Sequence, residues 1–173
     1  MEKEAELIEL VTTYLEMLTA PRSSPLGLDV RPVEQPSVSY FRYLYNTIGD
    51  GVNGYWWVRR QMTDAELQRI ITRPDSALFV LYEGGSPAGF YELDLTDPSN
   101  IEIAFFGILP EFQGRGFGHK LLDHALQNAW GRGPDRVWLH TCNFDSPQAL
   151  TTYKKAGLVV YAEEKEWIDL PAA

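Results

Sequence analysis

The sequence is poor in residues that bind metals or cross-link chains. It contains a single cysteine, Cys142, and three histidines among 173 residues. One cysteine cannot form a disulfide within the chain, and the three histidines do not cluster with the spacing of metal ligands. We therefore expect no structural metal.

Long apolar runs are also missing. The chain has no stretch of about 18 apolar residues, the length a helix needs to cross a bilayer. Its first residues, Met1 to Glu6, do not resemble the basic head of a signal peptide. From these absences we expect a cytoplasmic protein without a membrane partner.

Positive charge is in deficit, because 15 Lys and Arg stand against 24 Asp and Glu, for a net charge of −9. Binding to nucleic acid needs a basic surface, so we expect no nucleic-acid partner. An acidic surface attracts cationic amines, but scattered carboxylates also serve solubility alone. The composition leaves both explanations open.

The length and the hydrophobic content of 45% suit one compact domain over residues 1–173. In the first half, apolar periodicity and turn formers predict a helix over 4–18, a strand over 28–33, a helix over 37–47, a flexible glycine loop over 49–54 and a helix from the capping box Thr63–Glu66 to before Pro74. In the second half they predict strands over 77–83, 87–95, 100–109, 136–141 and 158–167, and helices over 114–130 and 146–156. This order of strands and helices predicts an α/β fold with a parallel element.

The most informative segment runs from Ile108 to Gly118, where an apolar strand passes through a glycine-rich turn into an amphipathic helix. The first amides of a helix have no intrahelical partner, and the helix dipole places about half a positive charge there. Glycines let an anion approach the bare backbone. The turn from Gln113 to Gly118 is therefore a candidate phosphate site.

Two motifs resemble those of the GNAT family of N-acetyltransferases. Gln113 to Gly118 is similar to the acyl-CoA-binding motif Gln/Arg-x-x-Gly-x-Gly/Ala, and Ser146 to Leu158 resembles a second motif, Asn-x-x-Ala-x-x-x-Tyr-x-Lys-x-Gly-Phe. The second departs at Ser146, where Asn is usual, and at Leu158, where Phe is usual. The resemblance covers about residues 76–168, and residues 1–60 carry no family pattern.

The resemblance implies a mixed central sheet flanked by helices, here with an extra N-terminal helix, in one acetyltransferase domain. Residues 1–36 would form the N-terminal helix and first strand, 37–74 the helices on the acceptor side, and 76–168 the core that binds acetyl-CoA. The residues implied in cofactor binding are Phe106 and Ile108 through their backbone, Gln113, Gly114, Arg115, Gly116, Phe117 and Gly118 in the turn, and Asn143 and Ser146 after the strand that ends at 141. Ser146 is also expected to be a helix N-cap, followed by Pro147.

Acetyl transfer to an amine requires the amine to be neutral. At pH 7 a lysine-like amine is deprotonated in about one molecule in 2,500, so a general base is valuable. Glu102 is the first candidate, because it precedes Gln113 by eleven residues, the offset of the catalytic glutamate in some family members. Strand alternation would place it with Ala104 and Phe106. It is equally an ordinary strand carboxylate, and Glu92 and Asp94 compete for the role or for holding a cationic substrate.

The leaving thiolate needs a proton, and Tyr153 occupies the position of the family's general-acid tyrosine. With ordinary pKa values of about 10 for tyrosine and 8.5 for a thiol, this donation is uphill by roughly 2 kcal/mol. A buried packing role is the alternative for Tyr153. Cys142 is better explained as a buried thiol than as an acyl carrier, and the histidines as surface or strand residues.

The acceptor is not identified by the sequence. The aromatic run Tyr55-Trp56-Trp57 falls where family members build the acceptor pocket, and it suits either substrate binding or core packing. The expected function is acetyl-CoA-dependent acetylation of a small-molecule or peptide amine, with a possible homodimer as the assembly. The alternative is a non-catalytic acyl-CoA sensor or interaction module on the same fold.

Overall fold

A computed structural model describes residues 7–22, 27–52 and 56–169. In chain order the elements are β1 (Leu7–Met17), β2 (Asp29–Val33), α1 (Val38–Gly51), the 3-10 turn η1 (Val58–Arg60), α2 (Asp64–Ile71), β3 (Ser76–Glu83), β4 (Ser86–Asp94), β5 (Asn100–Ile108), the 3-10 turn η2 (Pro110–Phe112), α3 (Phe117–Trp130), β6 (Arg136–Cys142), α4 (Ala149–Lys155) and β7 (Val159–Asp169). The strands form one sheet in the order β2-β3-β4-β5-β6-β1-β7. Its pairs are antiparallel except β5 with β6, which confirms the predicted mixed α/β sheet with a parallel element.

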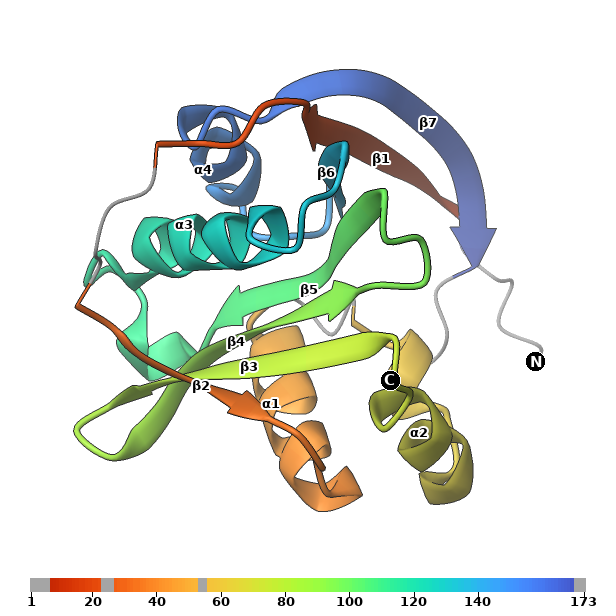
Figure 1. Ribbon diagram of the computed structural model, residues 1–173. Helices are drawn as coiled ribbons and strands as arrows, with labels where there is room; N and C mark the ends of the chain where they lie inside the picture. The colour runs from red at the N-terminus through yellow and green to blue at the C-terminus, as the bar shows by residue number, and fades with distance from the viewer. Residues whose placement is uncertain (1–6, 23–26, 53–55, 170–173) are drawn as a thin grey trace, which may run out of the picture.

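Helices cover both faces of the sheet (Figure 1): α3 and α4 lie on one face, and α1 and α2 on the other. Each face has its own apolar core. Leu121, Leu122, Ala125 and Leu126 of α3 pack on the first, and Phe41, Leu44 and Ile48 of α1 pack on the second. The sheet therefore separates two compartments, and any passage between them has to run between strands.

The helices α1 and α2 begin at the caps that their sequences provide. Ser37 Oγ accepts a hydrogen bond from the Tyr40 amide, and Thr63 with Glu66 completes the predicted capping box of α2. The expected glycine loop over 49–54 is wrong at its start, because α1 continues through Gly51. Gly49 is buried there against Trp56, so this part of the segment packs as helix; residues 53 and 54 lie outside the described residues.

The predicted N-terminal helix over 4–18 is wrong. Residues 7–17 form β1, which pairs antiparallel with β6 on one side and with β7 on the other. The run from Val11 to Tyr14 is rich in β-formers, and Leu15 is fully buried between Leu139 of β6 and Val160 of β7. Tertiary pairing with two strands therefore outweighs the helical spacing of the apolar residues.

Strands β5 and β6 diverge soon after they begin. They pair at three positions, from Asn100 with Arg136 to Glu102 with Trp138, although both strands continue for several residues. In the part of the chain that the structure describes, the edge of β5 from residue 103 onward is not paired with β6. This divergence opens the sheet at its centre.

A β-bulge in β5 changes which side chains face each compartment. Glu92 pairs with Phe105 and Leu93 with Ile103, so Ala104 is the extra residue. Ile103 before the bulge and Phe106 after it consequently both pack on the α3 side, whereas Phe105 packs on the α1 side. The expectation that Glu102 shares a face with Phe106 is therefore wrong, because it assumed unbroken alternation.

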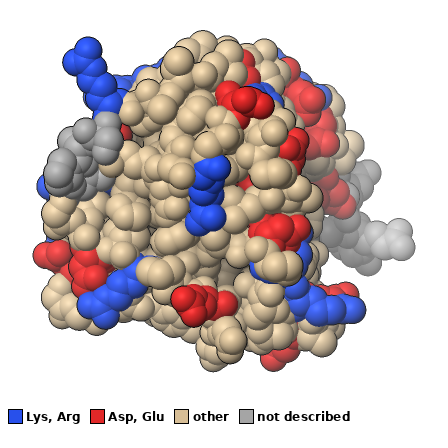
Figure 2. All heavy atoms as spheres, in the orientation of Figure 1, with Lys and Arg blue, Asp and Glu red and all other residues tan. Residues whose placement is uncertain are grey.

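The charged side chains are distributed over the surface. Figure 2 shows acidic and basic side chains interspersed on one face of the molecule. Of the helices in the described ranges, none combines the length and apolar character needed to cross a membrane. Across the same residues, no group of three or more His, Cys, Asp or Glu side chains is arranged to hold a metal ion.

Candidate active site

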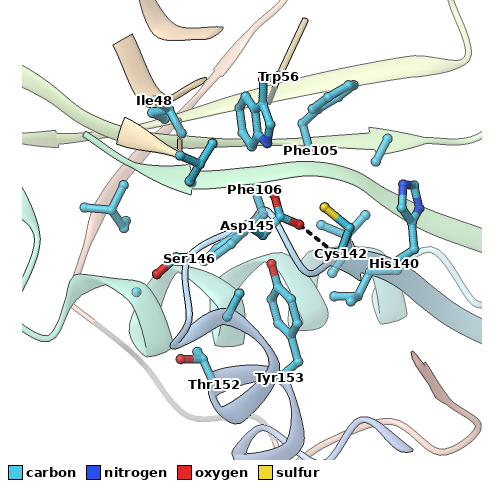
Figure 3. A pocket seen from close by; sticks show the side chains of 18 of the residues that line it. Ile48, Trp56, Phe105, Phe106, His140, Cys142, Asp145, Ser146, Thr152 and Tyr153 are labelled. Atoms are coloured by element: carbon cyan, nitrogen blue, oxygen red, sulfur yellow. Dashed lines mark hydrogen bonds between the residues drawn. The ribbon is translucent and has the colours of Figure 1, made fainter. Parts of the chain in front are cut away.

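A cavity of about 1100 Å³ passes through the opening between β5 and β6. On the α3 side it is lined by residues that we call the donor lobe, Gln113, Gly114, Gly118, Ala149 and Tyr153. On the α1 side it is lined by the acceptor lobe, Tyr45, Ile48, Trp56, Val58, Met62 and Phe105. Figure 3 shows Ile48, Trp56 and Phe105 on one side of the β5 ribbon and Ser146, Thr152 and Tyr153 on the other.

The glycine turn leads directly into α3, as the sequence predicts. Gly116 is the N-cap of the helix. Its φ of 79° lies in the left-handed region, which residues other than glycine rarely adopt. Since glycine has no side chain, it leaves the first amides of α3 without a side-chain cap. A Cβ added at Gly114 or Gly118 would meet no atom within 4 Å, so the backbone here borders open space in the cavity.

The structure brings most of the expected cofactor residues together. Those that line the cavity are Phe106, Ile108, Gln113, Gly114, Gly116, Gly118 and Ser146. Gln113 also fixes the turn, because its Nε2 donates to the Ile108 carbonyl at 3.1 Å. Backbone groups of an unpaired strand edge, open amides at a helix start and room beside them fit a long, phosphate-bearing ligand such as acetyl-CoA.

Three expected cofactor residues do not line this cavity. Arg115 is exposed, with its guanidinium 5.2 Å from the centre of the Phe112 ring, and Phe117 packs against the core on the α3 side. Asn143 ties the end of β6 to β1: its Oδ1 accepts from the Val11 amide at 2.9 Å and its Nδ2 donates to the Glu9 carbonyl at 3.0 Å. Asn143 thus has a structural role that only the unexpected strand β1 explains.

Ser146 lines the cavity but does not cap α4. The helix begins at Ala149 with Gln148 as its N-cap, and the Ser146 carbonyl accepts from the Ala149 amide at 2.9 Å. Ser146 therefore lies in a turn before the helix, so the predicted start of this helix is three residues too early.

Tyr153 projects from α4 into the cavity toward Phe106 and Asp145 (Figure 3). It is only 7% exposed, and its ring packs edge-on against Phe106 with centroids 6.2 Å apart. Burial, with a smaller effect of the Asp145 carboxylate, raises the pKa of Tyr153 well above its ordinary value. The phenol is consequently held in its protonated form.

Asp145 is a residue of the cavity wall that the sequence did not single out. Its Oδ2 accepts hydrogen bonds from Thr141 Oγ1 at 2.7 Å and from the Cys142 amide at 3.0 Å. These contacts fix the loop between β6 and α4. Both contacts run back to residues three and four positions earlier in the chain, so they close the loop locally.

Glu102 lies beside the main cavity rather than in its wall. It lines a smaller hollow of about 460 Å³ together with Asp94, Asp97 and Trp138. Its Oε1 is 3.2 Å from Nδ1 of His140, and His140 does line the main cavity. The hydrogen bond to Glu102 raises the pKa of His140 against the opposing effect of desolvation, with the charges of Glu102 and Asp145 adding to the rise. The sequence analysis explained His140 as a surface or strand residue, and its contact with Glu102, 38 residues earlier in the chain, leaves no local signal.

The other two carboxylates considered as bases have structural partners. Glu92, 2% exposed, receives Arg59 Nη1 and Nη2 at 2.5 and 2.9 Å and Ser76 Oγ at 3.2 Å. Asp94 accepts from the Thr96 amide at 2.9 Å and from Arg73 at 3.3 Å, and it lines the smaller hollow. Neither carboxylate is exposed in the main cavity.

The acceptor lobe rests on a tight aromatic cluster. The Trp56 ring lies 5.2 Å from Tyr45 and 5.4 Å from Phe105 between centroids. Gly107 makes this approach possible, because a Cβ there would come within 2.6 Å of Ile48 and 3.3 Å of Trp56. Trp56 and Trp57 of the predicted aromatic run both line the cavity, and Tyr55 lies outside the described residues.

Comparison with known proteins assigns the family. The model of the acetyltransferase (GNAT) family matches residues 29–158. The chain belongs to this family. The match begins at β2, so β1 lies outside it.

Relatives and solved structures agree with this assignment. An uncharacterized N-acetyltransferase of Methanocaldococcus jannaschii is 29% identical over 79% of this chain and 61% of its own length. The IAA acetyltransferase of Bacillus cereus has a TM-score of 0.58 and 25% identity over 78% of this chain and 79% of its own. The spermidine N-acetyltransferase of Vibrio cholerae, solved with CoA and spermine, has a TM-score of 0.61 at 23% identity over 76% and 80% of the two chains, and it shares the fold. The chain spans 61% and 57% of the first two curated relatives that it matches.

Proposed function

We propose that the protein transfers an acetyl group from acetyl-CoA to a primary amine by direct attack in a ternary complex. The observation that carries this proposal is the single cavity that joins the glycine turn of α3 to the aromatic side chains beside α1. Two substrates that enter from opposite faces of the sheet meet at the opening between β5 and β6. Tyr153 and His140 both line the wall of this cavity.

In this proposal the donor lobe holds acetyl-CoA mainly through backbone groups. The amides at the start of α3 receive the pyrophosphate, where Gly114 and Gly118 leave room for it. The edge of β5 from 103 to 108, which includes Phe106 and Ile108, hydrogen-bonds the pantetheine arm as an added strand would. An amide of this edge also polarises the thioester carbonyl as an oxyanion donor.

We assign the general base to His140, with Glu102 as its positioning residue. Nδ1 of His140 faces Glu102, so Nε2 is the nitrogen left to accept a proton from the amine. A carboxylate on the second nitrogen orients an imidazole and stabilises its protonated form. This assignment keeps Glu102 essential but moves the proton transfer to the residue that lines the cavity.

Tyr153 is proposed as the general acid. The neutral amine attacks the thioester carbon, so that a C–N bond forms, the C–S bond breaks, His140 takes one proton from nitrogen and Tyr153 gives one to sulfur. His140 then releases its proton to solvent and Tyr153 regains one, which leaves the protein unchanged. Because its pKa is raised, Tyr153 keeps its proton until negative charge develops on sulfur.

Calorimetry with acetyl-CoA, followed by a thiol-release assay over a panel of primary amines, tests the proposal. We expect acetyl-CoA to bind and thiol release to depend on the amine, with intersecting initial-rate lines, since both substrates must be bound together. Parallel lines would instead indicate an acyl-enzyme and would bring Cys142, which also lines the cavity, into consideration. Tight binding of acetyl-CoA with no amine-dependent release would overturn catalysis in favour of an acyl-CoA sensor.

A further inference from the structure

The acceptor lobe also limits the chemistry of the amine, an inference that rests on the function proposed above. We infer that the acceptor is a monoamine whose amino group is carried on an apolar or aromatic body, and that the site rejects amines that carry a second charge. The lobe is apolar, and the charged side chain that borders it among the described residues, Arg59, is already paired.

The walls of the lobe are apolar on the α1 side of the sheet. Ile48 of α1, Trp56 and Val58 around η1, Met62 and Phe105 of β5 all line it. Ile48, Trp56, Met62 and Phe105 belong to the same apolar cluster, so they form one connected surface. A methylene group transferred from water to such a surface is stabilised, whereas a charge transferred there without a partner is strongly destabilised.

Of the residues that the structure describes in this part of the cavity wall, Arg59 carries the charge, and that charge is paired. Both terminal nitrogens bond to Glu92, and the guanidinium lies 4.3 Å from the Phe105 ring centre and 5.2 Å from that of Phe41. Glu92 is buried behind Arg59, so its carboxylate is not offered to an ammonium group. The pair therefore leaves neither a positive site for a substrate carboxylate nor a negative site for a second ammonium.

The described acidic residues that line the main cavity lie outside the acceptor lobe. Among the described residues, the acidic side chains that line the main cavity are Asp123, Asp145 and Glu166, none of which belongs to α1, η1 or α2. The hollow that contains Asp94, Asp97 and Glu102 is separate, and its carboxylates bond to Thr96 and Arg73, to Ser99 and Asn100, and to His140. The net charge of the chain thus says little about the lobe that receives the acceptor.

The sharpest test compares two amines of nearly equal shape, hexylamine and 1,6-diaminohexane, at saturating acetyl-CoA. The second differs from the first by an ammonium group in place of one hydrogen atom on the terminal carbon. We expect kcat/KM to be at least about tenfold higher for hexylamine, even though the diamine has two reactive ends. From propylamine to hexylamine, kcat/KM should rise about fourfold with each methylene until the lobe is filled.

A designed change of preference tests the same inference from the protein side. Val58 is 52% exposed and lines the lobe, so Val58→Glu places a carboxylate beside it with little effect on the core. We expect this variant to raise the ratio of kcat/KM for diaminohexane over hexylamine by about tenfold. Val159→Glu is the matched control, because Val159 is 65% exposed on β7 and lies outside the cavity, and its ratio should equal that of the parent.

The outcomes separate this inference from the function on which it rests. Preference for diaminohexane or spermidine over hexylamine in the parent protein would overturn the inference and leave the acetyltransferase function standing. Preference for an amino acid over its decarboxylated amine, for example phenylalanine over 2-phenylethylamine, would overturn it too, because that result requires a free positive site. If no amine caused thiol release although acetyl-CoA binds, the proposed function itself would be overturned.

Discussion

The donor lobe and the acceptor lobe are two ends of one cavity, but they are made from different parts of the polypeptide. The donor lobe presents backbone, in the glycine turn before α3 and along the unpaired edge of β5. The acceptor lobe presents side chains from α1, η1 and β5 that also form a hydrophobic core. The comparison teaches that a ligand held by backbone leaves a short local pattern in the sequence, whereas one held by packed side chains does not.

The two lobes should also differ in how binding relates to stability. A side chain added at Gly118 faces open space, so a substitution there changes ligand binding without disturbing the core. A substitution beneath the acceptor lobe removes core contacts as well. Five substitutions test this contrast and the roles proposed for the residues around the cavity.

Glu92→Gln should destabilise the protein by about 3–5 kcal/mol, because it leaves the buried Arg59 guanidinium without its counter-charge. Urea denaturation measures the change. The double variant Arg59→Met/Glu92→Leu, which removes both charges, should recover most of the loss. A loss below about 1 kcal/mol for Glu92→Gln would mean that the acceptor lobe is not tied to stability through this pair.

Gly118→Asp should weaken acetyl-CoA binding by at least about 100-fold, since it places a carboxylate where open amides attract phosphate. Stability should be unchanged or higher, because glycine is a poor helix former and an acidic residue near a helix start gains about 0.3–1 kcal/mol. Calorimetry measures the affinity for acetyl-CoA, and thermal melting measures the stability. Gly118→Ala controls for size alone and should bind more tightly than the aspartate variant.

Tyr153→Phe should lower kcat about 100-fold and leave acetyl-CoA affinity unchanged, because it removes only the proton donor. The ring contact with Phe106 is kept, so the fold should be retained. Steady-state kinetics and calorimetry measure the two effects. Tyr43→Phe, at an exposed position of α1 outside the cavity, should behave as the parent; equal kcat in both variants would remove Tyr153 from the acid role.

Glu102→Gln should shift the pH dependence of kcat. His140 acts as a base only when neutral, so activity rises as the pH passes its pKa, which Glu102 raises. Removing the carboxylate lowers that pKa, and the rise should move to lower pH with a plateau about tenfold lower, as for the loss of a charge-assisted hydrogen bond of about 1.5 kcal/mol. The groups around His140 that also act on its charge or position are Asp145, Tyr14 and Trp138.

His140→Gln completes the pH experiment. It should remove the rise that the parent shows, because no imidazole is left to titrate. An unchanged rise in Glu102→Gln would separate Glu102 from His140. An unchanged rise in His140→Gln would exclude the histidine as the base.

Much of the donor half could be predicted from local sequence. The turn from Gln113 to Gly118, the start of α2 at Thr63 and the sheet strands after residue 76 depend on residues close in the chain. Local caps, glycine conformations and strand periodicity are sufficient for them. The family model confirms the family membership that these motifs indicate.

The structural features that the sequence does not predict share one physical cause, which is contact between segments that are distant in the chain. The helical spacing of residues 7–17 is real, but β6 and β7 supply pairing that a single sequence window cannot contain. The bulge at Ala104 depends on the partner strand β4, and it reverses the face that simple alternation assigns to Glu102 relative to Phe106. Asn143 and His140 acquire their partners in the same way, from β1 and from β5.

The position of β1 has a consequence for synthesis on the ribosome. β1 is made before both of its neighbours, β6 and β7, which come from residues 136–169. At about 5–20 residues per second, roughly 8–30 s pass between synthesis of β1 and completion of β7. Until β6 and then β7 are made, β1 exposes strand edges and apolar side chains, which are features that promote aggregation and recruit chaperones. β1 can therefore take its place in the sheet only after residues 136–169 have been synthesised.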